Sequence, residues 1–435
     1  MNYTKFLAAC LLVLLFSPAH SMTISLDEVL SQAISYSYDL QQSAIDIDIS
    51  RANERSRNSL YLPALKLRFN SEYTKDLLSN KSNVVSIGDS LLGNSTKYQD
   101  SISIILTSPL FYYDILQKRS YIDRQDVSMK SLIHRKNQVD LKVHILEMYK
   151  KILLLSKELF VKKELFLCYK ELFNLKDRLN NAGSVSKVEV ADQALEIAYI
   201  VNGIDSLKLK LRDALLDLSF YTGISYDEEA LIIKNIDSDW IAGKEITVSA
   251  NNSLEYRICQ LELEKKKAEL DIALKENWPK IDLYVQYALY GSDKESLKTA
   301  LRDMKGTSLT AGISSSLGLF DGFRNAANIE RLTLELKRLE IESNKIIFQT
   351  KQNQLKLVML LNQHSTGLQN NKEIVTKINS KSAMIGKLVQ QQITDRESVL
   401  VNRINETNQK FELERNNITM VSEIKKMVLL SEVDN

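Results

Sequence analysis

The sequence predicts a mainly α-helical protein with a small β part and an internal duplication. Proline is scarce: there are only four prolines in 435 residues, against an average usage of about five per hundred. Residues 114–182 contain neither Gly nor Pro over a run of 69 residues. Proline interrupts helix interiors, so these two observations predict long uninterrupted helices. Two short runs instead alternate between apolar and polar residues, which is typical of β-strands.

The first alternating run follows Pro63. The chain reads as a helix up to Leu62, and from there Leu65, Leu67 and Phe69 are apolar while the residues between them are polar. Pro63 disfavours helix at the residue before it, so it places the end of the helix and the start of the strand. The second run, residues 280–291, follows Pro279 in the same way.

The two alternating runs belong to a duplication. Residues 37–63 align with residues 253–279 without a gap, at an offset of 216 (279 minus 63), and place proline on proline. A second match, of residues 108–114 with residues 317–323, has an offset of 209. Two matches in the same order predict a structural repeat. We expect a first repeat over residues 22–230 and a second over residues 231–435.

Each half has a second alternating run that pairs with the first. These runs cover residues 101–107, where Ile105 interrupts the alternation, and residues 309–317. Polar segments at residues 79–97 and 291–306 separate the paired runs. Each pair therefore predicts a β-hairpin with a long loop.

Each hairpin precedes a long helix and a return helix. In the first half, Gly183 marks the end of the outgoing helix, Ser184 or Ser186 is the N-cap of the return helix, and that helix ends near Tyr221. The second half repeats this from Asn325 to about residue 391 and back to about residue 430, with Gly367 expected to interrupt the outgoing helix.

The N-terminus predicts a secretory signal peptide over residues 1–21. Lys5 precedes the apolar segment 6–16, and residues 19–21 fit a small-x-small cleavage site. That apolar segment is about half of the roughly 20 residues needed to cross a bilayer. Cys168 and Cys259 remain in the mature chain, and we expect two buried thiols rather than a disulfide.

The alternating strands fit the tilted strands that cross an outer membrane, with lipid on one face and water on the other. The residues expected to face lipid are Leu65, Leu67, Phe69, Ile281, Leu283 and Val285. Open sheet edges are prohibitive in lipid, and four strands cannot close a barrel. Several chains would therefore have to combine to give eight, twelve or sixteen strands. The alternative is a soluble sheet with one face on a core.

In the order and spacing of its motifs, the chain resembles the TolC-like outer-membrane factor family over nearly all of the mature sequence. The segments that carry the resemblance are residues 23–43, residues 61–73, "GLFDGFRNAANIE" at 318–330, and "NAGSVSKVEVADQALEIAY" at 181–199. The resemblance implies a homotrimer in which long coiled helices form a periplasmic α-barrel. It also implies that the twelve strands form one shared transmembrane β-barrel.

The two helical turns are the candidate periplasmic entrance and adaptor contact. They end the longest helices and so lie farthest from the strands. The candidate residues are Gly183, Ser186, Glu189, Asp192, Asp395, Glu397 and Ser398, within turns at 183–192 and 394–401. Family members often carry acidic residues at this entrance in the second repeat. At an offset of 209, Glu189 and Asp192 correspond to the uncharged Ser398 and Val401, and Asp395 and Glu397 are out of register.

Composition and motifs do not favour an enzyme. The net charge is +2, from 57 basic and 55 acidic residues, which gives no global field for attracting nucleic acid. The sequence has no common hydrolase or nucleotide-binding motif, and the spacing of His144 and Glu147 alone is weak evidence for a metal site. We expect no catalytic residue, no cofactor and no metal.

Two functions are consistent with these features. The first is the outer-membrane conduit of a tripartite efflux pump or a type I secretion system, which would work with a periplasmic adaptor and an inner-membrane transporter. The second is a periplasmic or secreted coiled-coil scaffold without a pore.

Overall fold

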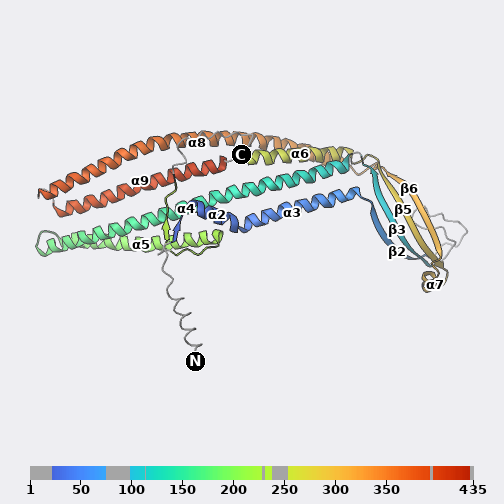
Figure 1. The fold of residues 1–435 in the computed structure, drawn as a ribbon, viewed down its shortest axis with the longest axis horizontal. Helices are drawn as coiled ribbons and strands as arrows, with labels where there is room; N and C mark the ends of the chain where they lie inside the picture. The colour runs from blue at the N-terminus through green and yellow to red at the C-terminus, as the bar shows by residue number, and fades with distance from the viewer. Residues whose placement is uncertain are drawn as a thin grey trace, which may run out of the picture. The chain divides into compact units, whose positions relative to one another are not determined.

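The fold was analysed in a computed structural model that describes residues 22–74, 98–112, 114–227, 231–237, 253–391 and 395–431. The segment predicted to be a signal peptide lies outside these residues, as do residues 79–97 of the first hairpin loop. The described chain is mainly helical and carries four longer strands (Figure 1), which confirms the predicted fold class.

The element order repeats along the chain. The first half consists of β1 (Met22–Ile24), α2 (Leu26–Tyr36), α3 (Tyr38–Asn58), η1 (Ser59–Tyr61), β2 (Ala64–Tyr73), β3 (Tyr98–Phe111), α4 (Ile115–Asn181) and α5 (Lys187–Thr222). The second consists of β4 (Leu231–Ile233), α6 (Leu254–Lys275), β5 (Lys280–Asp293), α7 (Leu297–Arg302), β6 (Gly306–Ser316), α8 (Arg324–Gln390) and α9 (Arg396–Ser431). Helices α4 and α8 both have 67 residues, and α5 and α9 both have 36. Both pairs start 209 residues apart (324 minus 115, 396 minus 187), which supports the duplication.

Several predicted boundaries were wrong in detail. Helix α8 runs unbroken through Gly367, because one glycine inside a helix costs only about 1 kcal/mol and neighbouring turns hold it. Strand β5 continues past Gly291 to Asp293, and the polar loop after it contains α7. Leu317 lies just beyond the end of β6.

The four longer strands form one antiparallel sheet in the order β2-β3-β5-β6. The two hairpins therefore lie side by side, joined through β3 and β5. A register shift between Pro109 and Phe111 interrupts the pairing of β3 with β5. Proline has no N–H to donate to a ladder, so an irregularity at this position is expected.

The chain divides into two compact units, each containing segments of both repeats. One unit takes residues 1–44, 132–257 and 344–435, and the other takes residues 45–131 and 258–343. Spatial compactness therefore does not follow the repeat boundary. The division into repeats at residues 22–230 and 231–435 remains a proposal about the origin of the chain.

Tyr149 of α4 lies in the core of the first unit and connects α4 to β1 and β4. Its side chain is fully buried, and its hydroxyl donates to the carbonyl oxygen of Lys234 at 2.6 Å and lies 3.2 Å from that of Ile24. These residues lie on or beside β1 and β4, which pair in parallel. The largest apolar cluster surrounds this point and draws on α2, α4, α5 and α9.

Helix α9 packs against two other helices of the same unit. Leu400 and Ile404 of α9 cluster with Leu165, Cys168 and Leu172 of α4. Nearer its end, α9 forms another cluster with Leu357 of α8. Cys168 and Cys259 are both buried and unpaired, which confirms the prediction for the two thiols. Within the described residues, no helix combines the length and apolar character that a membrane span requires.

Candidate functional sites

The register of the sheet brings the predicted lipid-facing residues onto one face. Directly opposite residues in antiparallel strands project to the same side. One row across the sheet consists of Leu67, Ile104, Tyr287 and Leu309. The adjacent row on that face consists of Leu65, Leu106, Val285 and Ala311. Phe69 in β2 and Ile281 and Leu283 in β5 are at odd-numbered positions, as are Leu65, Leu67 and Val285. All six candidates therefore lie on the same face.

The other face is mostly polar. Its rows include Lys66, Ile105, Gln286 and Thr310, and Arg68, Ser103, Ala288 and Ser308. Ile105, which interrupted the alternation in the sequence, is thus an isolated large aliphatic side chain among polar neighbours. The pairing shows that it does not shift the register of β3.

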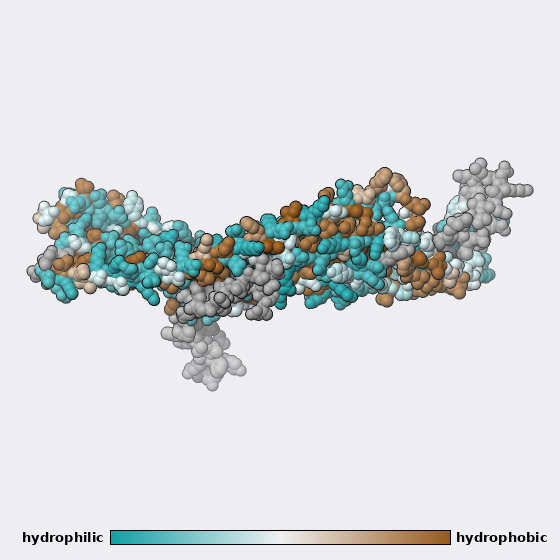
Figure 2. Space-filling model, turned by 90° about the horizontal axis from the view of Figure 1, so that it is seen from above, coloured by the Kyte–Doolittle hydropathy of each residue, from teal (hydrophilic) through white to brown (hydrophobic). Residues whose placement is uncertain are grey.

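The apolar face is exposed in the single chain. Leu65 is 69 % exposed and Leu67 is 73 % exposed, and Phe69, Leu309 and Ile313 are also well exposed. Figure 2 shows apolar side chains gathered over the part of the molecule that holds the strands. A face this apolar and this open needs a covering medium or partner.

Strands β2 and β6 form the two edges of the sheet. Each has a neighbour on one side only among the described strands, so the backbone groups of its outer side are available for pairing with another strand. The edges are 10 and 11 residues long. A second copy of the chain would offer a β2 to pair with β6.

The first helical turn is closed by Gly183 and Ser186. Gly183 has φ of 76°, a conformation that glycine adopts without the steric cost of a side chain. Ser186 is the N-cap of α5 and accepts from the Glu189 N–H at 3.2 Å, while its hydroxyl donates to the Glu189 carboxylate at 3.1 Å. Of the two predicted caps, Ser186 rather than Ser184 is therefore correct. Asp192 is exposed on the next turn of α5.

The second helical turn has a cap at the same position, but here a carboxylate is the capping side chain and a serine lies three residues after it. Asp395 accepts from the Ser398 N–H at 3.1 Å at the start of α9. Hydrogen bonds from the Ser398 side chain and backbone hold the pKa of the Asp395 carboxyl below its usual value. Asp395 corresponds to Ser186, and Ser398 to Glu189, at the offset of 209. Both turns thus carry one serine and one carboxylate, in opposite order. Thr394, at the start of the predicted tip, lies outside the described residues.

Ion pairs connect α9 to α4 near this turn. Arg396 pairs with Glu171, and Glu397 pairs with Lys176 at 3.5 Å. Farther along, Lys426 contacts Glu147 at 3.0 Å. Burial opposes ionisation of Glu147, but hydrogen bonds from Lys150 and Lys426 outweigh it and lower the pKa of the Glu147 carboxyl. The start of α9 is thus held to α4 by charge as well as by apolar contacts.

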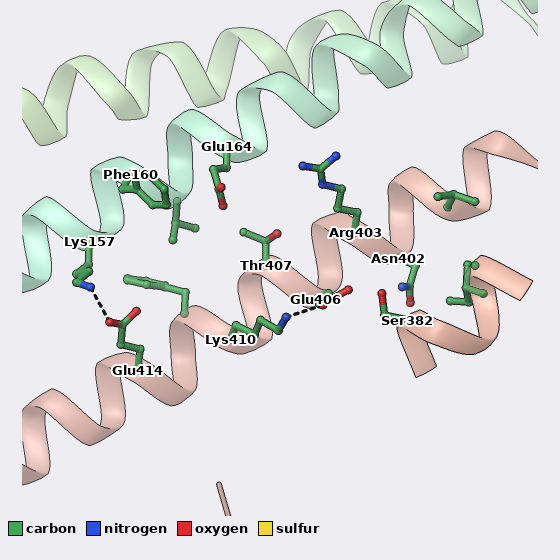
Figure 3. Close-up of a pocket in the computed structure, with 15 residues that line it drawn as sticks. Lys157, Phe160, Glu164, Ser382, Asn402, Arg403, Glu406, Thr407, Lys410 and Glu414 are labelled. Carbon is green, nitrogen blue, oxygen red and sulfur yellow. Dashed lines mark hydrogen bonds and ion pairs between the residues drawn. The ribbon is translucent and has the colours of Figure 1, made fainter. Parts of the chain in front are cut away.

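A cavity of about 600 Å³ lies between α4, α8 and α9 (Figure 3). Two ion pairs lie in its walls, Lys157–Glu414 at 2.8 Å and Lys410–Glu406 at 2.6 Å. Glu164 and Arg403 also line it, and Phe160 is largely exposed. Its lining mixes charges of both signs with an aromatic ring.

The side chains considered for a metal site have other partners. His144 stacks edge-on against Tyr221 with ring centroids 5.0 Å apart, and Glu147 is engaged by two lysines. The described residues contain no group of three or more His, Cys, Asp and Glu side chains that could hold a metal ion.

Sequence reasoning missed the ion pairs between α4 and α9 and the exchanged cap. Both depend on which helices lie side by side, and residue spacing within one helix does not give that information. The cap had a local signal, because "DRES" at 395–398 places a capping aspartate three residues before a serine.

Comparison with known proteins gives one family match. Residues 29–223 match the model of the outer membrane efflux protein family. No curated protein sequence matches the chain.

Solved structures match the whole fold at low sequence identity. VceC, an outer membrane protein of Vibrio cholerae, has a TM-score of 0.74 and 11 % identity, covering 92 % of this chain and 95 % of VceC. The outer membrane channel CmeC of Campylobacter jejuni has a TM-score of 0.73 and 13 % identity, covering 93 % of this chain and 84 % of CmeC. CusC, studied for its transmembrane channel formation, has a TM-score of 0.71 and 16 % identity, covering 93 % of this chain and 92 % of CusC.

Proposed function

We propose that the chain is a member of the outer membrane efflux protein family, whose model matches residues 29–223, and that it is the outer-membrane channel of a tripartite efflux pump or a type I secretion system. In this role it passes substrates delivered by periplasmic partners across the outer membrane. Its long helices extend into the periplasm.

The observation that carries this proposal is the two-faced sheet with open edges. One face is apolar across all four strands, and the other is rich in charged, hydroxyl and amide side chains. Lipid outside and water inside would stabilise such a sheet. A soluble sheet would need a core layer over the apolar face, yet Leu65 and Leu67 are more than two-thirds exposed.

Three copies of the chain would close their sheets into one barrel. Pairing of β6 with β2 of the next copy leaves no open edge, as lipid requires. The number three comes from the family resemblance, and with four strands per chain it gives twelve strands. The partners of the assembled channel would be a periplasmic adaptor protein and an inner-membrane transporter.

The two helical turns are the proposed entrance and adaptor contact. Glu189 and Asp192 lie three residues apart and share one face of α5, and Asp395 caps α9. In a trimer these residues would supply nine carboxylates from three copies, and a ring of carboxylates favours cations. Gly183 and Ser186 shape the first turn, and Glu397 and Ser398 shape the second.

Reconstitution into a planar lipid bilayer tests the channel function. The detergent-extracted protein should insert and produce stepwise increases in conductance. Membrane fractionation should place the protein in the outer membrane and require detergent for its release. Release by salt alone, without conductance, would instead favour a coiled-coil scaffold without a pore.

A further inference from the structure

Asp100, near the start of β3, is an acidic residue buried without a hydrogen-bond donor. Its side chain is 1 % exposed, and neither carboxylate oxygen has a hydrogen-bond partner among the described residues. A carboxylate that is removed from water is strongly disfavoured unless hydrogen bonds or a positive charge compensate it. The described part of the chain therefore leaves this group in need of a compensating partner.

Helix α7 packs over the part of the sheet that contains Asp100. It contacts β3 and β5, the two central strands, at the end of the sheet away from α3 and α6 (Figure 1). Gly291 of β5 pairs directly with Asp100. Directly opposite residues project to the same side of a sheet, with Cβ positions about 4.5–5.5 Å apart. Groups that lie over Gly291 on this side are therefore close to the Asp100 side chain.

The backbone at the C-terminal end of α7 lies over Gly291 on this side. A Cβ on Gly291 would collide with the Ala300 carbonyl oxygen and would lie 3.0 Å from the Asp303 carbonyl oxygen. The Ala300 carbonyl is one of the last in α7, and such carbonyls have no partner within the helix. The Met304 N–H is also 3.0 Å from this Cβ position, but it donates to neither oxygen of Asp100. Two carbonyl oxygens and a buried carboxylate thus lie close together.

We propose that Asp100 and the carbonyl oxygens of Ala300 and Asp303 bind a calcium ion, which holds α7 on the sheet. A cation between these oxygens replaces their mutual repulsion with attraction. Calcium binds carboxylate and carbonyl oxygens in irregular geometry, and water can complete its set of about six to eight ligands. Magnesium instead requires near-octahedral geometry and gives up its water reluctantly, and zinc prefers nitrogen and sulfur ligands.

Backbone oxygens supply part of the proposed site, which distinguishes it from a cluster of acidic side chains. The nearby Asp293 has other partners, because its carboxylate accepts from the N–H groups of Glu295 and Ser296, both at 2.8 Å. A single carboxylate gives the site little negative charge. Its calcium dissociation constant should therefore be about 10⁻⁴–10⁻³ M, as in weak extracellular calcium modules.

Calcium titration of the detergent-extracted full-length protein tests the site. Isothermal titration calorimetry is performed on wild type, Asp100→Asn and Asp293→Asn. Asp100→Asn keeps the shape of the side chain and removes its charge. Asp293→Asn removes a carboxylate from the same region, and its amide oxygen can still accept the two N–H bonds. Wild type and Asp293→Asn should each bind about one more calcium ion per chain than Asp100→Asn. Calcium bound by detergent or residual lipid is the same in all three samples.

Protection of α7 from proteolysis tests whether the ion holds the helix in place. Endoproteinase Lys-C cleaves after Lys298, in α7. Because an ion that binds only the closed form reduces the open population by one plus the ratio of ion concentration to dissociation constant, about 10 mM calcium should slow this cleavage tenfold or more. Asp100→Asn and Gly291→Ala should both lose the calcium effect. The first lacks the carboxylate, and in the second the added methyl group displaces the Ala300 carbonyl.

Equal calcium binding in wild type and Asp100→Asn would overturn the proposal, and so would cleavage at Lys298 that does not respond to calcium in wild type. Either result would assign the buried Asp100 carboxyl to its protonated, neutral form. An equal response to magnesium would overturn the assignment to calcium. None of these measurements depends on conduction, so their failure would leave the proposed channel function standing.

Discussion

The sheet and the long helices both expose large apolar side chains, but the side chains that neighbour them differ in charge. Leu67 in β2 and Phe160 in α4 are 73 % and 62 % exposed. On the sheet, the exposed residues form rows on one face, and Lys66, Arg68 and Glu72 of β2 lie on the other. Asp100, near the start of β3, has the same parity as the apolar residues and is buried. Along α4, exposed apolar residues are interspersed with ion-paired lysines such as Lys157.

This difference in neighbouring side chains indicates that the sheet and the helices contact different solvents. Apolar rows such as those through Leu65 and Leu67 are stable against acyl chains, where lysine and arginine are costly. A helix surface that mixes aromatic rings with ion pairs suits water and contact with other helices. The same chain therefore carries one region adapted to lipid and another adapted to an aqueous compartment.

The largest effect should come from adding a charge to the apolar face. Leu67→Arg and Val285→Arg should each destabilise the inserted protein by about 2–4 kcal/mol if they lie near the bilayer midplane. The measurement is the fraction of protein recovered in the outer membrane. Arg68→Ser, on the opposite face and next to Leu67 in sequence, should have little effect. Equal losses in all three variants would remove the distinction between the two faces.

The elements that the sequence predicted well are those with long or regular patterns. The hairpins, the two faces and the long helices follow from alternation, proline positions and the absence of helix breakers. The parallel pairing of β1 with β4 joins three-residue strands about two hundred residues apart, and such short segments have no periodicity to detect. Helix α7 was missed for the same reason, because its six residues lie within a polar loop.

Only the local geometry of the candidate residues could be predicted, and only in part. Capping by Ser186 followed from its spacing to Glu189, and the strand candidates followed from alternation. Phe323, between β6 and α8, has φ of 65°. This left-handed conformation could not be predicted, because the residue type argues against it. Asp114, its counterpart at the offset of 209, has φ of 63° as well.

A smaller effect is expected from acid on the helical region. The folded protein holds the pKa of Glu147 below its ordinary value of 4.5. This group therefore stabilises the folded state above that value, and the stabilisation is lost as the pH falls through the lower folded pKa. Since the pair with Lys426 is about one-third exposed, its contribution should be about 1 kcal/mol or less.

Glu147→Gln tests this contribution. The variant should lower the thermal midpoint of the detergent-extracted protein at neutral pH and reduce its further drop in acid. Glu158→Gln, on the same helix and without an ion pair to the described residues, serves as the control. An identical pH profile in wild type and Glu147→Gln would exclude this ion pair as a determinant of acid stability.

The smallest effect on stability, and a specific one on conduction, should come from the helical turns. Glu189→Gln combined with Asp192→Asn should raise anion permeability and weaken block by multivalent cations, because the proposed carboxylate ring loses six charges in a trimer. Single-channel recording gives both quantities. Asp395→Asn keeps a capping side chain and tests the second turn in the same way. If selectivity and block do not change in either variant, the narrowest charged point lies elsewhere.

In the proposed channel, copies of the same chain close the open edges of the sheet in lipid. Native mass spectrometry of the detergent-extracted protein tests it most directly. The four-stranded sheet of each chain and the family resemblance predict a complex of three chains. A stable monomer that still conducts ions in a bilayer would contradict the account, because a four-stranded sheet with two open edges cannot by itself enclose a water-filled pore.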